Sequence, residues 1–222
     1  MFKIAIDGPS GSGKSTLAKR LSSELGFVYV DTGALYRSIG LFVYRAKIDP
    51  NDAKGVEAVL PEISVSIKYV NGEQRTFLGD EDVSGDIRLP EISMYASAVS
   101  AIPAVRAFLL GIQRDIISSN NVIMDGRDIG TVIMSDADVK LFLVSNNETR
   151  AQRRCEELLA KGVHTTYEEV LADLEKRDAN DSSRAVAPLI PAEDAIFLDN
   201  SQFTPDQTFA CAFEIIKSKI DI

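Results

Sequence analysis

The stretch from Gly8 to Thr16 limits what this chain can fold into more than any other part of the sequence. It reads GPSGSGKST and matches G-x-x-x-x-G-K-[ST], with Gly8, Gly13, Lys14 and Ser15 at the fixed positions. Glycines let the backbone turn its N–H groups around a polyphosphate, while the lysine reaches the β- and γ-phosphates and the serine hydroxyl binds Mg²⁺. The stretch therefore predicts a loop that holds the phosphates of ATP or GTP, in preference to a glycine-rich surface turn.

The residues on both sides of this loop support that interpretation. An apolar run, Phe2 to Ile6, precedes it, and Leu17, Leu21 and Leu25 follow at a spacing of four residues. This pattern predicts a strand that leads into an amphipathic helix. The positive N-terminal end of such a helix adds to the binding of phosphate.

Short apolar runs determine the fold class. They are separated by segments with helical periodicity, and they cover residues 2–6, 27–30, 122–124, 139–144 and 195–198. This alternation predicts an α/β fold, with a five-stranded parallel sheet and helices on both of its faces. In such sheets ligands bind beyond the carboxyl ends of the strands, so we expect functional residues directly after these runs.

Residues 62–88 follow a different pattern. Apolar and polar residues alternate from Ile63 to Tyr69, Asn71-Gly72 predicts a tight hairpin turn, and 75–78 can return antiparallel. We therefore expect a small antiparallel insertion. Helical spacing resumes from Pro90 to about Ser118. Further helices are expected to begin at the capping patterns Ser145–Glu148 and Thr166–Glu169.

The composition restricts the classes of partner. Lys and Arg number 24 against 33 Asp and Glu, which gives a net charge of −9 and makes general nucleic-acid binding improbable. Cys155, Cys211 and His164 are the only cysteines and the only histidine, which argues against a disulfide framework or a Cys/His zinc site. Because no apolar stretch approaches the length of a membrane span and no signal peptide is visible, we expect a cytoplasmic protein.

Three groups of charged residues are candidates for a binding site. Arg37 points away from the apolar stripe of its predicted helix, and Asp125-Gly126-Arg127-Asp128 directly follows the third apolar run. Arg177, Asp181 and Arg184 fall at steps of four and three, on one face if the helix continues that far. Each group also has a plain structural interpretation, as a solvated arginine, a salt-bridged turn or surface pairing along a helix.

Taken together, separate stretches resemble the bacterial-type cytidylate kinases, which have the nucleoside monophosphate kinase fold. The resemblance covers the whole chain and rests on IDGPSGSGKST at the start, DTGALYR at 31–37, DVSGDIR at 82–88, DGRDIGTV at 125–132 and KRDANDSSRAVAPL at 176–189. The 62–88 insertion looks like the extra small sheet in the monophosphate-binding region of the bacterial type. The resemblance implies transfer of the γ-phosphoryl group of ATP to CMP or dCMP.

The resemblance also implies a role for individual residues. ATP is expected to bind to the phosphate loop, at Gly8, Pro9, Ser10, Gly11, Ser12, Gly13, Lys14, Ser15 and Thr16. CMP is expected to bind to Thr32, Arg37, Ser97, Arg106, Arg127, Asp128, Arg177, Asp181 and Arg184. Catalysis is expected to depend on Lys14, Arg127, Arg153 and Arg177. Mg²⁺ is expected to bind directly to Ser15, with Asp125 reaching it through water.

This chain departs from the family pattern in a few places. Family members often have glycine where this chain has Ser15 and serine where it has Thr32. They also carry more arginines where it has Ala179, Asn180, Ser182 and Ser183, which weakens any lid contact assigned to those positions.

The implied organisation is a single kinase domain over 1–222. It has a monophosphate-binding region at 31–118, and a short lid with flanking helices at about 150–188. A monomer is expected, with ATP and CMP or dCMP as partners and neither nucleic acid nor membrane. The alternatives are a small phosphate-loop kinase for UMP, AMP or another small acceptor, a GTPase-like switch, and a nucleotide-binding module without catalysis. The switch is disfavoured because no N-K-x-D motif occurs.

Overall fold

The computed structural model describes residues 1–70, 73–160 and 162–221. The hairpin turn expected at Asn71-Gly72 lies outside the described residues. The chain divides into two compact units, Met1–Tyr29 with Asn120–Ile222, and Val30–Ser119. The single domain expected over 1–222, with a monophosphate-binding region at 31–118 and a lid at about 150–188, stays a prediction.

The parallel sheet belongs to the first unit, except for Val30 and Asp31 at the end of one edge strand. Its strand order is β2-β6-β1-β7-β8, and the strands are β1 (Lys3–Asp7), β2 (Val28–Asp31), β6 (Val122–Gly126), β7 (Val139–Val144) and β8 (Ile196–Asp199). All five predicted strands and the predicted fold class are confirmed. β1 is central, and its last residue, Asp7, is in register with Gly126 on one side and Phe142 on the other.

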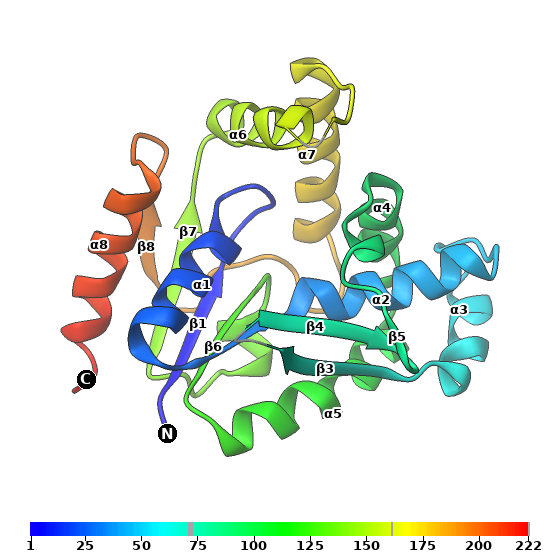
Figure 1. Cartoon of the computed structure of the whole chain (residues 1–222), viewed down its shortest axis with the longest axis horizontal. Helices are drawn as coiled ribbons and strands as arrows, with labels where there is room; N and C mark the ends of the chain where they lie inside the picture. The colour runs from blue at the N-terminus through cyan, green and yellow to red at the C-terminus, as the bar shows by residue number, and fades with distance from the viewer. Residues whose placement is uncertain (71–72, 161, 222) are drawn as a thin grey trace. The chain divides into compact units, whose positions relative to one another are not determined.

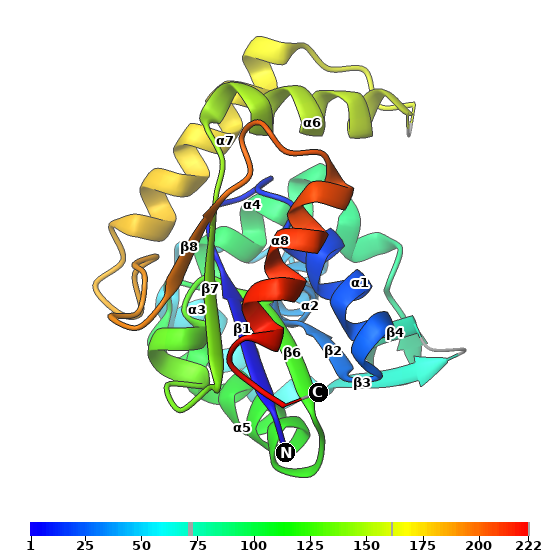
Figure 2. The same cartoon turned by 90° about the vertical axis from the view of Figure 1, so that its left-hand side faces the viewer.

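Two helices lie side by side on one face of this sheet (Figures 1 and 2). They are α1 (Lys14–Leu25) and α8 (Pro205–Lys217). Leu17 and Leu21 of α1 pack with Ile216 of α8 against Ile4 and Ile6 of β1, and all five are buried. The leucine spacing predicted for the first helix therefore places its stripe in the core.

The helices α6 (Asn147–Ala160) and α7 (Tyr167–Ser182) follow β7 and pack on each other (Figure 1). The capping box at Thr166–Glu169 is confirmed at the start of α7. The predicted box at Ser145–Glu148 is wrong by one residue. Asn146 caps α6, because its Oδ1 accepts the N–H of Thr149 at 2.8 Å.

A short π-helical turn, η3 (Ile129–Ile133), follows β6. Arg127 and Asp128 are the two residues between the end of β6 at Gly126 and the start of this turn. These residues therefore lie at the carboxyl end of a strand next to the central one, where ligands of such sheets bind.

The second unit combines helices with a small sheet. Its elements are α2 (Thr32–Arg45), α3 (Ala53–Val59), η1 (Leu60–Glu62), β3 (Val65–Val70), β4 (Glu73–Leu78), β5 (Glu81–Asp82), η2 (Asp86–Arg88), α4 (Pro90–Val99) and α5 (Pro103–Ser119). The antiparallel pairing of β3 with β4 confirms the predicted insertion, and Pro103 opens α5 as expected. Leu35, Ile39 and Val43 of α2 bury one face against Val105 and Leu109 of α5.

Within the described residues, no single helix is long and apolar enough to cross a membrane. One pair of helices in the described part of the chain, α4 and α5, reaches that length and composition together, but it is bent by 101° at the break between them.

Candidate active site

The phosphate loop leaves the carboxyl end of β1 and enters α1. Gly8, Gly11 and Gly13 all have positive φ, at 148°, 75° and 90°. A side chain at Gly8 would also place its Cβ 2.2 Å from the carbonyl oxygen of Leu143, so only glycine can occupy this position. The glycines predicted from the motif are therefore required by the backbone conformation of the loop.

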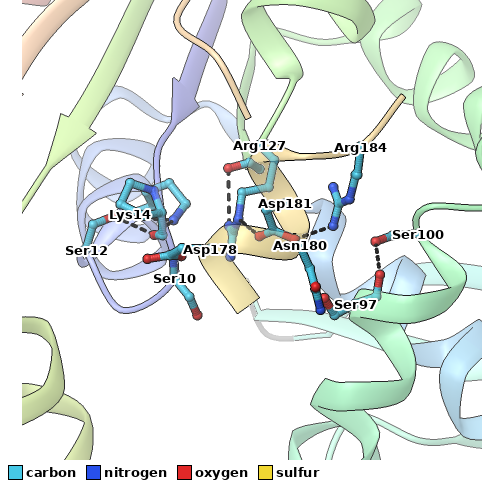
Figure 3. Close-up of polar contacts among 12 residues, drawn as sticks. Ser10, Ser12, Lys14, Ser97, Ser100, Arg127, Asp178, Asn180, Asp181 and Arg184 are labelled. Atoms are coloured by element: carbon cyan, nitrogen blue, oxygen red, sulfur yellow. Dashed lines mark hydrogen bonds and ion pairs between the residues drawn. The ribbon is translucent and has the colours of Figure 1, made fainter. Parts of the chain in front are cut away.

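Lys14 folds back over this loop. Its ammonium group donates to the carbonyl oxygen of Pro9 at 2.6 Å and to Oγ of Ser12 at 3.3 Å (Figure 3). Burial and the nearby Arg127 guanidinium hold the pKa of Lys14 well below its usual range. A positive charge is therefore costly at this point, and a phosphate group beside it would favour the charged form.

Ser15 lies against a buried carboxylate. Its hydroxyl donates to Oδ2 of Asp125 at 2.8 Å, and the hydroxyl of Tyr29 donates to Oδ1 of the same residue at 2.9 Å. Within the described residues, no three His, Cys, Asp or Glu side chains converge as metal ligands. A hydroxyl beside one carboxylate fits Mg²⁺, which usually takes only one or two protein ligands and completes its shell with phosphate oxygens and water.

Asp181 joins two of the predicted arginines. Nε of Arg127 donates to its Oδ2 at 2.7 Å, and Arg184 donates to its Oδ1 (Figure 3). Burial opposes ionisation of Asp181, but the two guanidinium groups outweigh this effect and lower its pKa. Asp181 as a whole is only 4% exposed, so this is a buried ion-pair network and not surface pairing along a helix.

Arg177 lies one helical turn before Asp181 on α7. Its Nε is buried, and no hydrogen-bond acceptor for it occurs among the described residues. Burial lowers the pKa of its guanidinium, and the charge of Arg127 adds to this effect. Such an orphaned donor favours an anionic or hydroxylated ligand, because a buried donor without an acceptor is costly.

Arg150 and Asp178 contact the phosphate loop and were not among the site residues predicted from the sequence. Arg150 donates to the carbonyl oxygen of Ser10 at 2.8 Å and to Oδ2 of Asp178 at 2.5 Å. Oδ1 of Asp178 accepts the N–H of Ser10 at 3.2 Å. The ion pair of Arg150 and Asp178 therefore binds both backbone groups of Ser10. No local pattern in the sequence indicates contacts between residues that are 140 and 168 positions apart.

Arg153 reaches a different side of the loop. Its Nη2 donates to the carbonyl oxygens of Asn200 at 2.9 Å and Phe203 at 3.1 Å. Nδ2 of Asn200 in turn donates to the carbonyl oxygen of Ser12 at 3.0 Å. In this structure Arg153 therefore supports the segment after β8, which touches the loop, and its expected catalytic contact with phosphate stays a prediction.

Asp128 and Asp7 are both buried beside the turn that carries Arg127. Asp7 accepts the N–H groups of Ile129 at 2.9 Å and Gly130 at 2.7 Å. Burial raises the pKa of Asp7 to about 6 despite these hydrogen bonds. Asp7 was not predicted as a site residue, although it directly precedes the phosphate-loop motif.

The second unit holds the other predicted CMP residues. Thr32 is the first residue of α2, which is capped by Asp31 through the N–H of Ala34 at 3.0 Å. Asp31 also accepts from Arg88 at 2.6 Å, and both Arg88 and Arg37 help to lower its pKa against the effect of burial.

Ser97 and Arg106 belong to one polar group on α4 and α5. Nη1 of Arg106 donates to the carbonyl oxygen of Ser100 at 3.3 Å, and its guanidinium carbon lies 5.6 Å from the centre of the Tyr36 ring. Oγ of Ser100 donates to the carbonyl oxygen of Ser97 (Figure 3). The Oγ of Ser97 is buried, and among the described residues it has no hydrogen-bond partner.

A protein that binds nucleotide in order to move a phosphoryl group needs positive side chains close to its phosphate loop. Here the turn after β6 and the end of α7 supply them, since Arg127 is close enough to Lys14 to lower its pKa. The parallel sheet and this arrangement together define a phosphate-loop kinase.

Comparison with known proteins identifies the family. A family model described as Cytidylate kinase matches residues 4–218. The cytidylate kinase of Caldanaerobacter subterraneus is 48% identical over 215 residues, covering 97% of this chain and 94% of its own. That of Caldicellulosiruptor bescii is 46% identical over 214 residues, covering 96% of this chain and 95% of its own. The chain belongs to the cytidylate kinase family.

One solved structure supports the fold. A protein from Eubacterium ventriosum, described as uncharacterized, superposes with a TM-score of 0.54 at 14% identity, covering 98% of each chain.

Proposed function

We propose that this protein transfers the γ-phosphoryl group of ATP to CMP or dCMP, giving ADP and CDP or dCDP. Membership of the cytidylate kinase family over residues 4–218 is the observation that carries this proposal. The hydrogen bond between Ser15 and Asp125 supports it, as do the electrostatic effects of Arg127 and Asp125 on Lys14, because these groups have the chemistry that phosphoryl transfer requires.

The phosphate loop would hold the donor. The backbone N–H groups of residues 8–16 would surround the ATP phosphates, and Lys14 would exchange its contact with the Pro9 carbonyl for one with a phosphate oxygen. Ser15 and Asp125 would hold Mg²⁺, whose charge offsets the negative charge on the transferring group. A protein carbonyl is a neutral acceptor, so an anionic phosphate replaces it favourably as the partner of Lys14.

The acceptor supplies its own nucleophile. A phosphate oxygen of CMP is already anionic, so no general base has to remove a proton. This agrees with the single histidine of the chain, His164, which is exposed. The site then has to align two anionic phosphates. We assign Arg37 and Arg127 to the phosphate of the acceptor. We assign Lys14, Arg153 and Arg177 to the transferring phosphoryl group.

The base would be selected by hydrogen-bond polarity. Asp128 as a carboxylate would accept from the N4 amino group of cytosine, while Arg106 and Arg184 would donate to its ring acceptors. The orphaned hydroxyl of Ser97 would gain a partner from the base, and Thr32 would lie beside it. Arg177 and Asp181 would contact the ribose. Uracil presents O4 where cytosine presents an amino group, so it would face the Asp128 carboxylate with an acceptor.

An ADP-release assay with the full chain, ATP and Mg²⁺ tests this proposal across CMP, dCMP, UMP, AMP and GMP. We expect CMP and dCMP to be good acceptors and UMP to be worse in kcat/KM by up to on the order of 10⁴. The Lys14→Met variant serves as the control for contaminating kinases and is expected to be inactive on every acceptor. Equal turnover of UMP and CMP would refute the base assignment, and activity with AMP alone would favour the alternative of a different monophosphate kinase.

The remaining expectations concern partners and location. The charge of −9 supports a small, locally recognised phosphate ligand over nucleic acid. A monomer, the absence of a membrane partner and a cytoplasmic location stay predictions from the sequence.

A further inference from the structure

We propose that Asp7 is a positioning residue for the acceptor nucleotide, because it holds both ends of the segment that carries Arg127 and Asp128. This inference rests on the proposed function, since it explains how two of the residues assigned to CMP are oriented. Asp7 itself has no assigned contact with either substrate.

The first attachment is through the backbone. Asp7 is the last residue of β1 and is in register with Gly126, the last residue of β6. Ladder hydrogen bonds between these parallel strands therefore fix the segment at the residue just before Arg127.

The second attachment is through the side chain. The Asp7 carboxylate accepts the N–H of Ile129 at 2.9 Å with one oxygen and the N–H of Gly130 at 2.7 Å with the other. These are the first N–H groups of η3, which have no partner inside a helix and require an acceptor. Asp7 thus holds the segment at Gly126 and again at Ile129, and Arg127 and Asp128 are the two residues between these positions.

Asp7, and not Asp128 at the N-cap position of η3, accepts the first N–H groups of this turn. Asp128 occupies the N-cap position, yet within the described residues its side chain makes no capping hydrogen bond to η3. The side-chain hydrogen bonds to the first N–H groups of η3 therefore come from Asp7. This arrangement is consistent with the assignment of the Asp128 carboxylate to the amino group of the base.

The approach of the turn to Asp7 is close. A side chain at Gly130 would place its Cβ 3.4 Å from Oδ2 of Asp7 and 3.1 Å from Cδ of Lys140. An alanine here would make an ordinary van der Waals contact with Asp7 and require only a small shift of the Lys140 side chain, whereas a branched residue such as valine would push the turn away from the carboxylate. Gly130 thus provides a second way to loosen the attachment while Asp7 is kept intact.

The Asp7→Asn variant tests the proposal. The amide keeps one acceptor oxygen but presents an N–H₂ group to the other backbone N–H, so one charge-assisted hydrogen bond is lost. We expect the KM for CMP to rise by about 10- to 100-fold, the change that corresponds to loss of such a bond, while the KM for ATP stays within about twofold. A residue that only stabilised the fold would reduce the active fraction, which lowers kcat and leaves both KM values unchanged.

Asp138→Asn is the matched control. Oδ2 of Asp138 accepts the N–H of Lys3 at 2.7 Å, so this carboxylate also holds a backbone group of β1, but at the opposite end of the strand. We expect both KM values of this variant to match those of the wild type. If Asp7→Asn does not fold, Gly130→Val takes its place, with an expected rise of several-fold in the KM for CMP alone.

The outcomes separate the inference from the function on which it rests. If wild-type protein phosphorylates CMP, and folded Asp7→Asn or Gly130→Val changes neither KM or raises both equally, the positioning role is refuted. If wild-type protein does not phosphorylate CMP, the proposed function fails. Amide hydrogen exchange at Ile129 and Gly130 then still reports on the attachment, and it must be faster in Asp7→Asn than in the wild type.

Discussion

At the level of single side chains, the surroundings of the buried carboxylates in this site shift their pKa values in different directions. Asp181 is held ionised by two guanidinium groups, whereas Asp7 is surrounded by backbone N–H groups that do not fully offset its burial. The pKa of Asp7 is about 6 in the folded protein and near 4 in the unfolded chain. Between about pH 4 and pH 6, folding therefore favours the protonated form of Asp7.

This shift predicts a contribution of Asp7 to the pH dependence of stability. Its stabilising effect is fully present below pH 4 and is lost as the pH rises through about 6, because the native state then has to release a proton that it binds tightly. The change corresponds to about 3 kcal/mol. Nearby Asp128 adds to the shift and Lys14 opposes it.

Urea unfolding of the wild type and of Asp7→Asn between pH 4 and pH 8 measures this contribution. The difference between their free energies of unfolding should fall by about 3 kcal/mol across that range, since the other titrating groups are common to both proteins. Parallel curves for the two proteins would mean that Asp7 titrates normally.

Sequence reasoning located side chains that belong to a motif or that follow a predicted strand, and missed those whose role comes only from a distant partner. Lys14, Ser15 and Asp125 follow from the loop pattern and from the expectation that functional groups end parallel strands, although their roles stay predictions. Arg150 and Asp178 could not be found in this way, because their significance comes from Ser10, which is 140 and 168 residues away.

At the level of helices and strands, α6 and α7 are attached to the phosphate loop by the ion pair of Arg150 and Asp178. The Arg150 side chain is only 3% exposed, so its charge depends on the carboxylate for compensation. Removing one partner of such a pair leaves an uncompensated buried charge, which is far more costly than breaking a pair at the surface.

Asp178→Asn is therefore expected to lower the free energy of unfolding by about 3 kcal/mol or more, as measured by urea denaturation. The control is Glu157→Gln, which removes the partner of Arg154 in a more exposed pair on α6 and is expected to cost less than about 1 kcal/mol. Similar losses for the two variants would show that burial of the Arg150 pair carries no special weight.

The elements themselves were largely predictable. Periodicity located all five strands of the parallel sheet and the antiparallel insertion, because each strand buries at least part of its surface. β5 was not predicted, since two residues are too few to show alternation. The start of α6 was misplaced by one residue, because Ser145 and Asn146 are both good caps and only the hydrogen bond to Thr149 distinguishes them.

For the protein as a whole, a ligand that binds the folded state raises the free energy of unfolding. The preference for cytosine over uracil can therefore be measured without a catalytic assay. CMP at 100 times its Kd should raise the free energy of unfolding by about 2.7 kcal/mol, as measured by urea denaturation. UMP at the same concentration should leave it nearly unchanged, because O4 would oppose the Asp128 carboxylate. Equal stabilisation by UMP would contradict the proposed selection of the base.

The pairing of Asp181 with Arg127 and Arg184 has a further effect on which solutes can enter. Two guanidinium groups that share one carboxylate keep a net charge of +1 (2 − 1), so the carboxylate halves the positive charge that sulfate, chloride or inorganic phosphate would meet here. In the proposed binding mode a nucleotide would offer sugar hydroxyls to the carboxylate, phosphate oxygens to Arg127 and ring acceptors to Arg184, so it could replace all these internal contacts together. A small anion could replace only some of these contacts, so this part of the site would favour a nucleotide over the small anions of the cell.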